Sequence, residues 1–196
     1  MYKRQKYAVT VGNGSDALVF AMRALGIRKG DEVICPSNSF IASAWAIEAV
    51  GAKPVFCDVE DDLLISIEQI KKCISVNTRA ILAVHLTGKL CNVEPLIDFC
   101  EKNNIFLLED AAQAMGAEDN MGRRAGSFGV AAGFSMHPLK NFAVYGDGGF
   151  LTTNSEEIAK EVKLLRNHGL INRDAAIKWG FNLSLIHISE PTRLGA

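Results

Sequence analysis

Segments typical of β-strands and α-helices alternate along this chain. Runs rich in β-branched and apolar residues predict strands at residues 6–11, 32–35, 54–57, 80–84, 105–108, 129–134 and 150–153. Helical patterns predict helices that begin near residue 15 and at residues 40–50, 66–73, 95–101 and 155–168. Right-handed crossovers between such strands build a mostly parallel sheet with helices on both faces. The sequence therefore predicts a three-layer α/β/α fold.

A glycine turn, Gly12-Asn13-Gly14, joins the first predicted strand to the first helix. Ser15 or its neighbour is suited to cap this helix, and Gly26 is suited to end it. The turn lacks the third glycine of a dinucleotide-binding fingerprint, which makes a nicotinamide-binding fold the poorer interpretation.

Composition excludes several classes of protein. The chain has 196 residues, of which 48% are hydrophobic, so it is long enough for one sizeable core. A net charge of -1 argues against nucleic acid or an anionic membrane as a partner. No apolar run approaches the roughly 20 residues that span a bilayer, and no apolar segment of a secretory signal follows the basic start. We therefore expect a cytoplasmic protein.

The five cysteines form no C-x-x-C pair, and no histidines lie at metal-binding spacing. This pattern indicates reduced thiols rather than a disulfide framework, and it predicts no metal site.

A carboxylate and a lysine are placed where a ligand would be expected. The apolar run at residues 105–108 is followed by Glu109-Asp110, and open α/β sheets bind ligands at the carboxyl ends of their strands. Lys140 lies 30 residues later, among apolar and small residues in the segment 133–141. A surface lysine is the ordinary interpretation of such a residue. Together, however, the two groups could hold opposite ends of one cofactor.

Five segments resemble, in order and spacing, the DegT/DnrJ/StrS family of pyridoxal-phosphate-dependent sugar aminotransferases. They are Gly14-Ser15-Asp16-Ala17-Leu18, Pro36-Ser37-Asn38-Ser39-Phe40, Glu109-Asp110-Ala111-Ala112-Gln113-Ala114-Met115-Gly116-Ala117, Phe134-Ser135-Met136-His137-Pro138-Leu139-Lys140-Asn141 and Gly146-Asp147-Gly148-Gly149. The resemblance covers about residues 6–182. It implies the large domain of the aspartate-aminotransferase-like fold type I enzymes, here a partial domain at residues 1–182 that lacks the family's small C-terminal domain.

The resemblance implies roles for three residues around the edge of the cofactor ring. Lys140 would bind the cofactor covalently and move protons as an acid-base catalyst. Asp110 would pair with the pyridinium nitrogen, although an aspartate after a strand can also cap a helix. Gln113 would lie beside the ring hydroxyl, with a surface glutamine as the alternative.

Further residues would hold the phosphate and the ring face. Gly14 and Ser15 stand at a helix start, where free N–H groups favour an anion, and Ser135 matches a family hydroxyl near the same group. Phe40 resembles the aromatic that stacks on the ring, although it is also suited to a core. Asn182, in Trp179-Gly180-Phe181-Asn182, matches an asparagine that reaches a neighbouring subunit's cofactor phosphate.

The histidines favour transamination over sugar dehydration. Family relatives that dehydrate sugars carry histidine in place of the lysine, whereas here that position is Lys140 and His137 lies three residues earlier. We expect His85 and His168 to be partly buried or capping residues without a catalytic role.

The last residues depart from the family. Residues 183–193 read as the translation of a transposase adapter used in sequencing libraries, so we expect residues 183–196 to be an artefact rather than an amphipathic tail.

The resemblance therefore predicts an enzyme fragment. The whole protein would be a homodimer that moves an amino group from an amino acid, glutamate, to a keto sugar nucleotide. Two alternatives remain open: a non-catalytic or regulatory relative that keeps the fold, and a fragment that is inert by itself.

Overall fold

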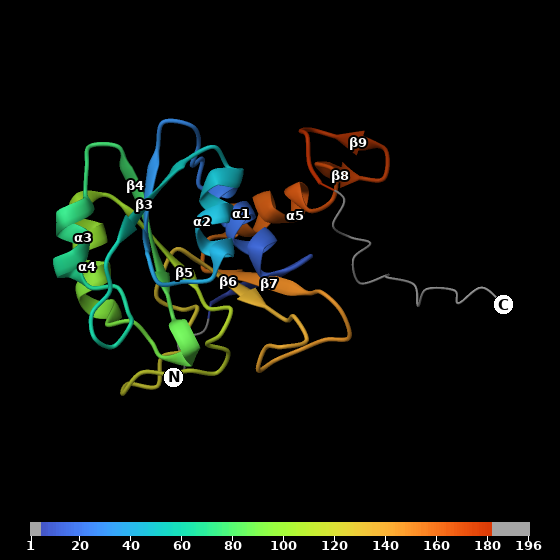
Figure 1. Ribbon diagram of the computed structural model, residues 1–196. Coiled ribbons are helices and arrows are strands. Elements are labelled where there is room, and N and C mark those ends of the chain that lie inside the picture. The colour runs from blue at the N-terminus through green and yellow to red at the C-terminus, as the bar shows by residue number, and fades with distance from the viewer. Residues whose placement is uncertain (1–4, 182–196) are drawn as a thin grey trace.

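A seven-stranded sheet forms the centre of the protein. The structure is a computed structural model, and it describes residues 5–181 (Figure 1). The strands lie in the order β1-β7-β6-β5-β4-β2-β3. Their bounds are β1 Tyr7–Val11, β2 Glu32–Pro36, β3 Lys53–Cys57, β4 Thr78–Val84, β5 Phe106–Asp110, β6 Ala131–Ser135 and β7 Gly149–Thr153. β7 runs in the direction opposite to the other six strands of this sheet, so the sheet is mostly parallel, as predicted.

Helices cover both faces of this sheet. They are α1 Gly14–Ala24, α2 Ile41–Ala49, α3 Ile67–Cys73, α4 Val93–Asn103 and α5 Glu156–Leu165. α1, α2 and α5 lie on one face, and α3 and α4 lie on the other (Figure 1). The predicted three-layer fold is confirmed. Within residues 5–181, no helix is long and apolar enough to cross a membrane.

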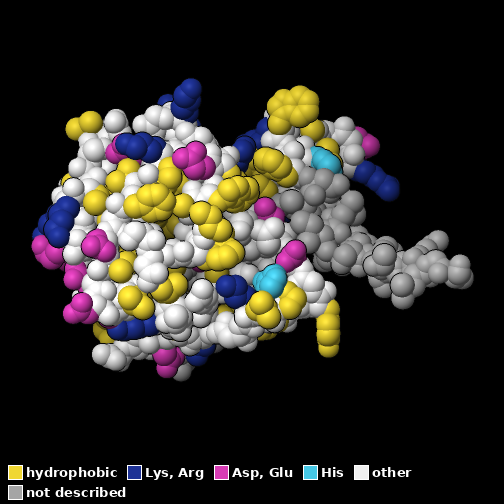
Figure 2. All heavy atoms as spheres, viewed as in Figure 1, with side chains coloured by type: hydrophobic (Ala, Val, Ile, Leu, Met, Phe, Trp, Pro, Cys, Tyr) yellow, Lys and Arg dark blue, Asp and Glu magenta, His cyan; other side chains and the backbone are white. Residues whose placement is uncertain are grey.

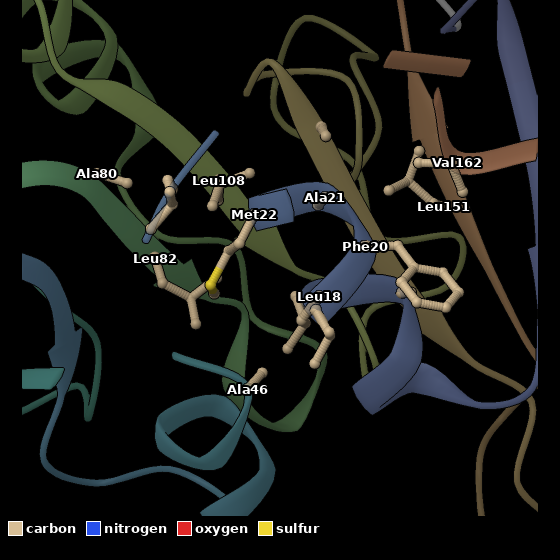
Figure 3. Packing of buried hydrophobic residues seen from close by; sticks show 14 of the residues in the cluster. Leu18, Phe20, Ala21, Met22, Ala46, Ala80, Leu82, Leu108, Leu151 and Val162 are labelled. Carbon is tan, nitrogen blue, oxygen red and sulfur yellow. The ribbon is translucent and has the colours of Figure 1, made fainter. Parts of the chain in front are cut away.

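Each face of the sheet has its own hydrophobic core. β4 shows why, because its side chains alternate between the two: Leu82 packs in the core beneath α1, whereas Ile81 packs in the core beneath α3 and α4. Figure 3 shows the first core, in which Met22 of α1 lies beside Leu82 and Leu108 of the sheet. A strand that is buried on both faces explains the continuous apolar runs in the sequence.

Element ends differ from the sequence expectations in a few places. Asn13 rather than Ser15 caps α1, because its side chain accepts the Asp16 N–H at 2.8 Å. The last helix stops at Leu165 instead of near residue 168, because His168 and Gly169 adopt left-handed backbone angles. The sequence did not predict the hairpin of β8 (Leu170–Asn172) and β9 (Ala175–Ala176) that follows.

Candidate active site

A pocket of about 380 Å³ opens where β4, β5 and β6 reach their carboxyl ends. Its volume lies within the range of small-molecule sites. The sequence-predicted site residues that the structure describes all line it: Gly14, Ser15, Phe40, Asp110, Gln113, Ser135 and Lys140. Asn182 lies outside the described residues.

One end of the pocket is suited to an anion. Gly14 begins α1, and a Cβ on it would come within 2.8 Å of the Cβ of Ser135, so the missing side chain lets the helix start lie directly against the end of β6. The first N–H groups of a helix have no partner inside it, and the helix dipole favours negative charge there. The Ser135 Oγ accepts the His137 N–H at 3.3 Å, which leaves its hydroxyl proton free to donate. The helix start and this hydroxyl form a corner that is suited to a phosphate or another anion.

Asp110 ends β5 and is only 7% exposed. Its two oxygens are held by different donors: Oδ1 accepts the Ala112 N–H at 3.1 Å, and Oδ2 accepts the Ser43 hydroxyl at 2.8 Å. These bonds stabilise a negative carboxylate and fix its plane at the pocket wall. The group is therefore poised to meet a cationic N–H.

Gln113 is oriented by the short 3₁₀ turn η1 (Leu86–Gly88) that follows β4. Its Oε1 accepts the Thr87 N–H at 2.8 Å, so the amide NH₂ is the group left to donate toward a ligand. Thr87 itself has φ 54, a left-handed angle that is uncommon for a residue other than glycine. The turn thus presents a hydrogen-bond donor at the pocket.

Lys140 lies in the loop between β6 and β7. A turn in which the Lys140 N–H donates to the His137 carbonyl at 2.8 Å shapes this loop. Among residues 5–181, no side chain forms a hydrogen bond or ion pair with the Lys140 amine. Phe40, at the cap position of α2, also lines the pocket and is 66% exposed.

Several pocket residues were missed by the sequence reasoning. Ser39, His85, His137 and Asp147 line the pocket although none was assigned to it. Burial and the charge of Asp147 raise the pKa of the Asp16 carboxyl, in the first turn of α1. Glu109 was also not assigned a role. Side chains alternate along a strand, so Glu109 of β5 must face the side of the sheet opposite to Asp110.

His85 differs from its expected setting. It is fully buried rather than partly buried, and its Nε2 lies 2.9 Å from Oε2 of the equally buried Glu109. The Cys91 N–H donates to its Nδ1 at 3.2 Å, so the Nε2 proton is directed at Glu109. His168 is exposed three residues after the end of α5, so it is not partly buried, and its left-handed backbone fits the alternative of a residue at a helix end. His85 is thus a buried residue of the pocket wall, paired with Glu109.

The DegT/DnrJ/EryC1/StrS aminotransferase family matches residues 1–189. The chain belongs to this family. It is 47% identical over 171 residues to the dTDP-3-amino-3,6-dideoxy-alpha-D-galactopyranose transaminase of Aneurinibacillus thermoaerophilus, covering 86% of this chain and 46% of that protein. It is 41% identical over 170 residues to the "Pleiotropic regulatory protein" of Geobacillus stearothermophilus, covering 86% of this chain and 45% of that protein. The chain therefore spans about half the length of these relatives.

Solved structures share the fold of this chain. NtdA of Bacillus subtilis, described with bound cofactor PMP, superposes with a TM-score of 0.84 at 33% identity, covering 91% of this chain and 41% of that chain. The chain belongs to this family and resembles a structure with bound PMP, so pyridoxal phosphate is the cofactor that this fold binds.

The residues of the pocket fit this cofactor. Its phosphate suits the corner made by Ser135 and the start of α1, where the close approach at Gly14 leaves no room for a side chain. Its ring nitrogen needs a carboxylate such as Asp110, its ring oxygen a donor such as the Gln113 amide, and its aldehyde an amine such as Lys140. One pocket supplies all four kinds of group.

Proposed function

We propose that this chain is the cofactor-binding half of an aminotransferase that moves an amino group from glutamate to a keto sugar nucleotide. One observation carries the proposal: Asp110 and Gln113, at and just after the end of β5, line a single pocket with Ser135 and Lys140, at and just after the end of β6. A relative with 47% identity is named as a sugar transaminase. The rest of the whole protein would supply the small C-terminal domain and much of the substrate site.

Each side chain would act at a separate part of the cofactor. The Lys140 amine would hold it covalently and, once released, carry the proton between two carbon atoms. The carboxylate of Asp110 would keep the ring nitrogen protonated, and the Gln113 amide would donate to the ring oxygen. Phe40 would cover one ring face. When bound, the cofactor supplies the electron sink that these residues orient.

A half-reaction with glutamate tests this function. We expect the whole protein, loaded with pyridoxal phosphate, to lose the visible absorbance of the bound cofactor on addition of glutamate and to release one equivalent of 2-oxoglutarate per active site. A keto sugar nucleotide should then restore the absorbance. A protein that shows neither change would instead be a non-catalytic relative, the alternative that the regulatory name of the Geobacillus stearothermophilus relative favours.

We also propose that the whole protein is a cytoplasmic homodimer whose interface includes α2. Ile41 is 71% exposed and Trp45 is 51% exposed, and both belong to α2, the helix that begins after Phe40. Figure 2 shows hydrophobic side chains gathered over this part of the surface. Contiguous apolar surface of this kind marks an interaction site. Asn182 would reach the phosphate site of the second copy.

The dimer proposal predicts the effect of charge on this helix. The double variant Ile41→Asp, Trp45→Asp should dissociate at a concentration at least about 10-fold higher than the unmodified protein, because buried charges at an interface are costly. Light scattering after size-exclusion chromatography measures the shift. The matched control is Val76→Asp, which changes a fully exposed residue in the loop before β4. Equal association of both variants would contradict an interface at α2.

A further inference from the structure

Two serines connect α2 to Asp110 through a short chain of hydrogen bonds. The hydroxyls of Ser39 and Ser43 lie 2.8 Å apart, and the Ser43 hydroxyl lies 2.8 Å from Asp110 Oδ2. Ser43 is 1% exposed, whereas Ser39 lines the pocket. The chain therefore runs from the pocket wall through a buried hydroxyl to the carboxylate.

The proton direction along this chain follows from the acceptor at its end. An ionised carboxylate can only accept, so the single Ser43 proton goes to Asp110. Ser43 must then accept from Ser39, whose oxygen keeps its lone pairs for other donors. Hydrogen bonds in series polarise one another, and a donor to a charged acceptor is among the stronger kinds. Both serines thus contribute to stabilising the charge of Asp110.

The same two residues also fix the place of Phe40. Ser39 and Ser43 flank it, and the Ser43 N–H donates to the Phe40 carbonyl at 3.0 Å to close the first turn of α2. Phe40 has no side-chain capping bond of its own. The contact between Ser43 and Asp110 therefore ties the start of this helix to the end of β5.

We propose that Ser43 is a positioning residue for the cofactor, which acts through Asp110, with Ser39 as the pocket end of the same chain. This inference rests on the proposed role of Asp110 at the ring nitrogen. By stabilising the negative carboxylate, Ser43 favours the charged pair of carboxylate and protonated ring nitrogen over the neutral pair. A positively charged ring nitrogen would make the proton on the Lys140 nitrogen that holds the cofactor easier to lose. Loss of the hydroxyl should have the opposite effect.

The test uses the visible absorbance of bound pyridoxal phosphate in the whole protein, titrated with pH. Ser43→Ala should raise the pH midpoint of the absorbance change by about one unit, which corresponds to one charge-assisted hydrogen bond. It should also weaken cofactor binding about tenfold. Ser39→Ala should shift the midpoint in the same direction by less, and Ser43→Thr, which keeps the hydroxyl, should restore it. The matched control Ser37→Ala alters an exposed serine of the same loop and should leave the midpoint unchanged.

Two further outcomes separate this inference from the proposed function. If Ser43→Ala lowers only the melting temperature and leaves the midpoint in place, Ser43 is a structural residue and the inference is wrong. Asp110→Asn should shift the midpoint more than Ser43→Ala does. If Asp110→Asn has no effect, the proposed role of Asp110 itself fails, and the inference fails with it.

Discussion

Lys140→Ala is expected to abolish covalent attachment of pyridoxal phosphate and to slow the half-reaction with glutamate by about 10³-fold or more. Lys140 is the only proposed group that would both hold the cofactor and transfer a proton, and loss of a general acid-base group alone costs about 10²–10⁴-fold. Its amine has no competing partner among the described residues, so it is available for both roles. Borohydride treatment followed by peptide mass spectrometry measures the attachment.

The controls for Lys140 separate chemistry from folding. Lys102→Ala alters an exposed lysine at the end of α4 and should keep both the borohydride-stable adduct and the rate. Added methylamine should restore part of the rate of Lys140→Ala, because a free amine can take over the proton transfer. An adduct that persists in Lys140→Ala would show that a different lysine binds the cofactor, and the assignment would be wrong.

The alternation of strands and helices predicted most of the fold because the central strands are buried on both faces and each helix on one. β4 is an example, since Leu82 and Ile81 reach opposite cores. The order of the strands could not be predicted from such local patterns. β1 pairs with β7, with Tyr7 opposite Thr153, and nothing near residue 7 specifies a partner so distant in the sequence. β7 runs antiparallel to β6 because the connection between them contains no helix, and a parallel pair usually needs a crossover helix.

The candidate site was predictable where a residue stands at the end of a strand or the start of a helix. Asp110 and Ser135 are the last residues of β5 and β6, and Gly14 is the first of α1, so the topology alone brings them to one edge of the sheet. Ser43 gave no such signal. Its role depends on how α2 docks against β5, and this contact involves residues 67 positions apart.

Glu109→Gln is expected to destabilise the folded protein by about 3 kcal/mol or more, because the fully buried Glu109 carboxylate accepts four donors. Oε1 accepts the N–H groups of Phe128 at 2.8 Å and Gly129 at 2.6 Å. Oε2 accepts the Gly126 N–H at 2.7 Å and lies 2.9 Å from His85 Nε2. An amide has one oxygen, so its NH₂ group would face two donors and leave them unsatisfied.

Urea unfolding of the variant measures this loss, with Glu48→Gln on the exposed side of α2 as the matched control, expected to lie within about 0.5 kcal/mol of the unmodified protein. A loss as small as that of the control would mean that the turn at Gly126 can bind water instead.

The position of Glu109 gives the substitution a second expected effect, on cofactor binding. It precedes Asp110 and supports His85 in the pocket wall, so Glu109→Gln should weaken cofactor binding even below the urea concentrations that unfold the protein. Fluorescence titration with pyridoxal phosphate, in the absence of urea, separates that local effect from global unfolding.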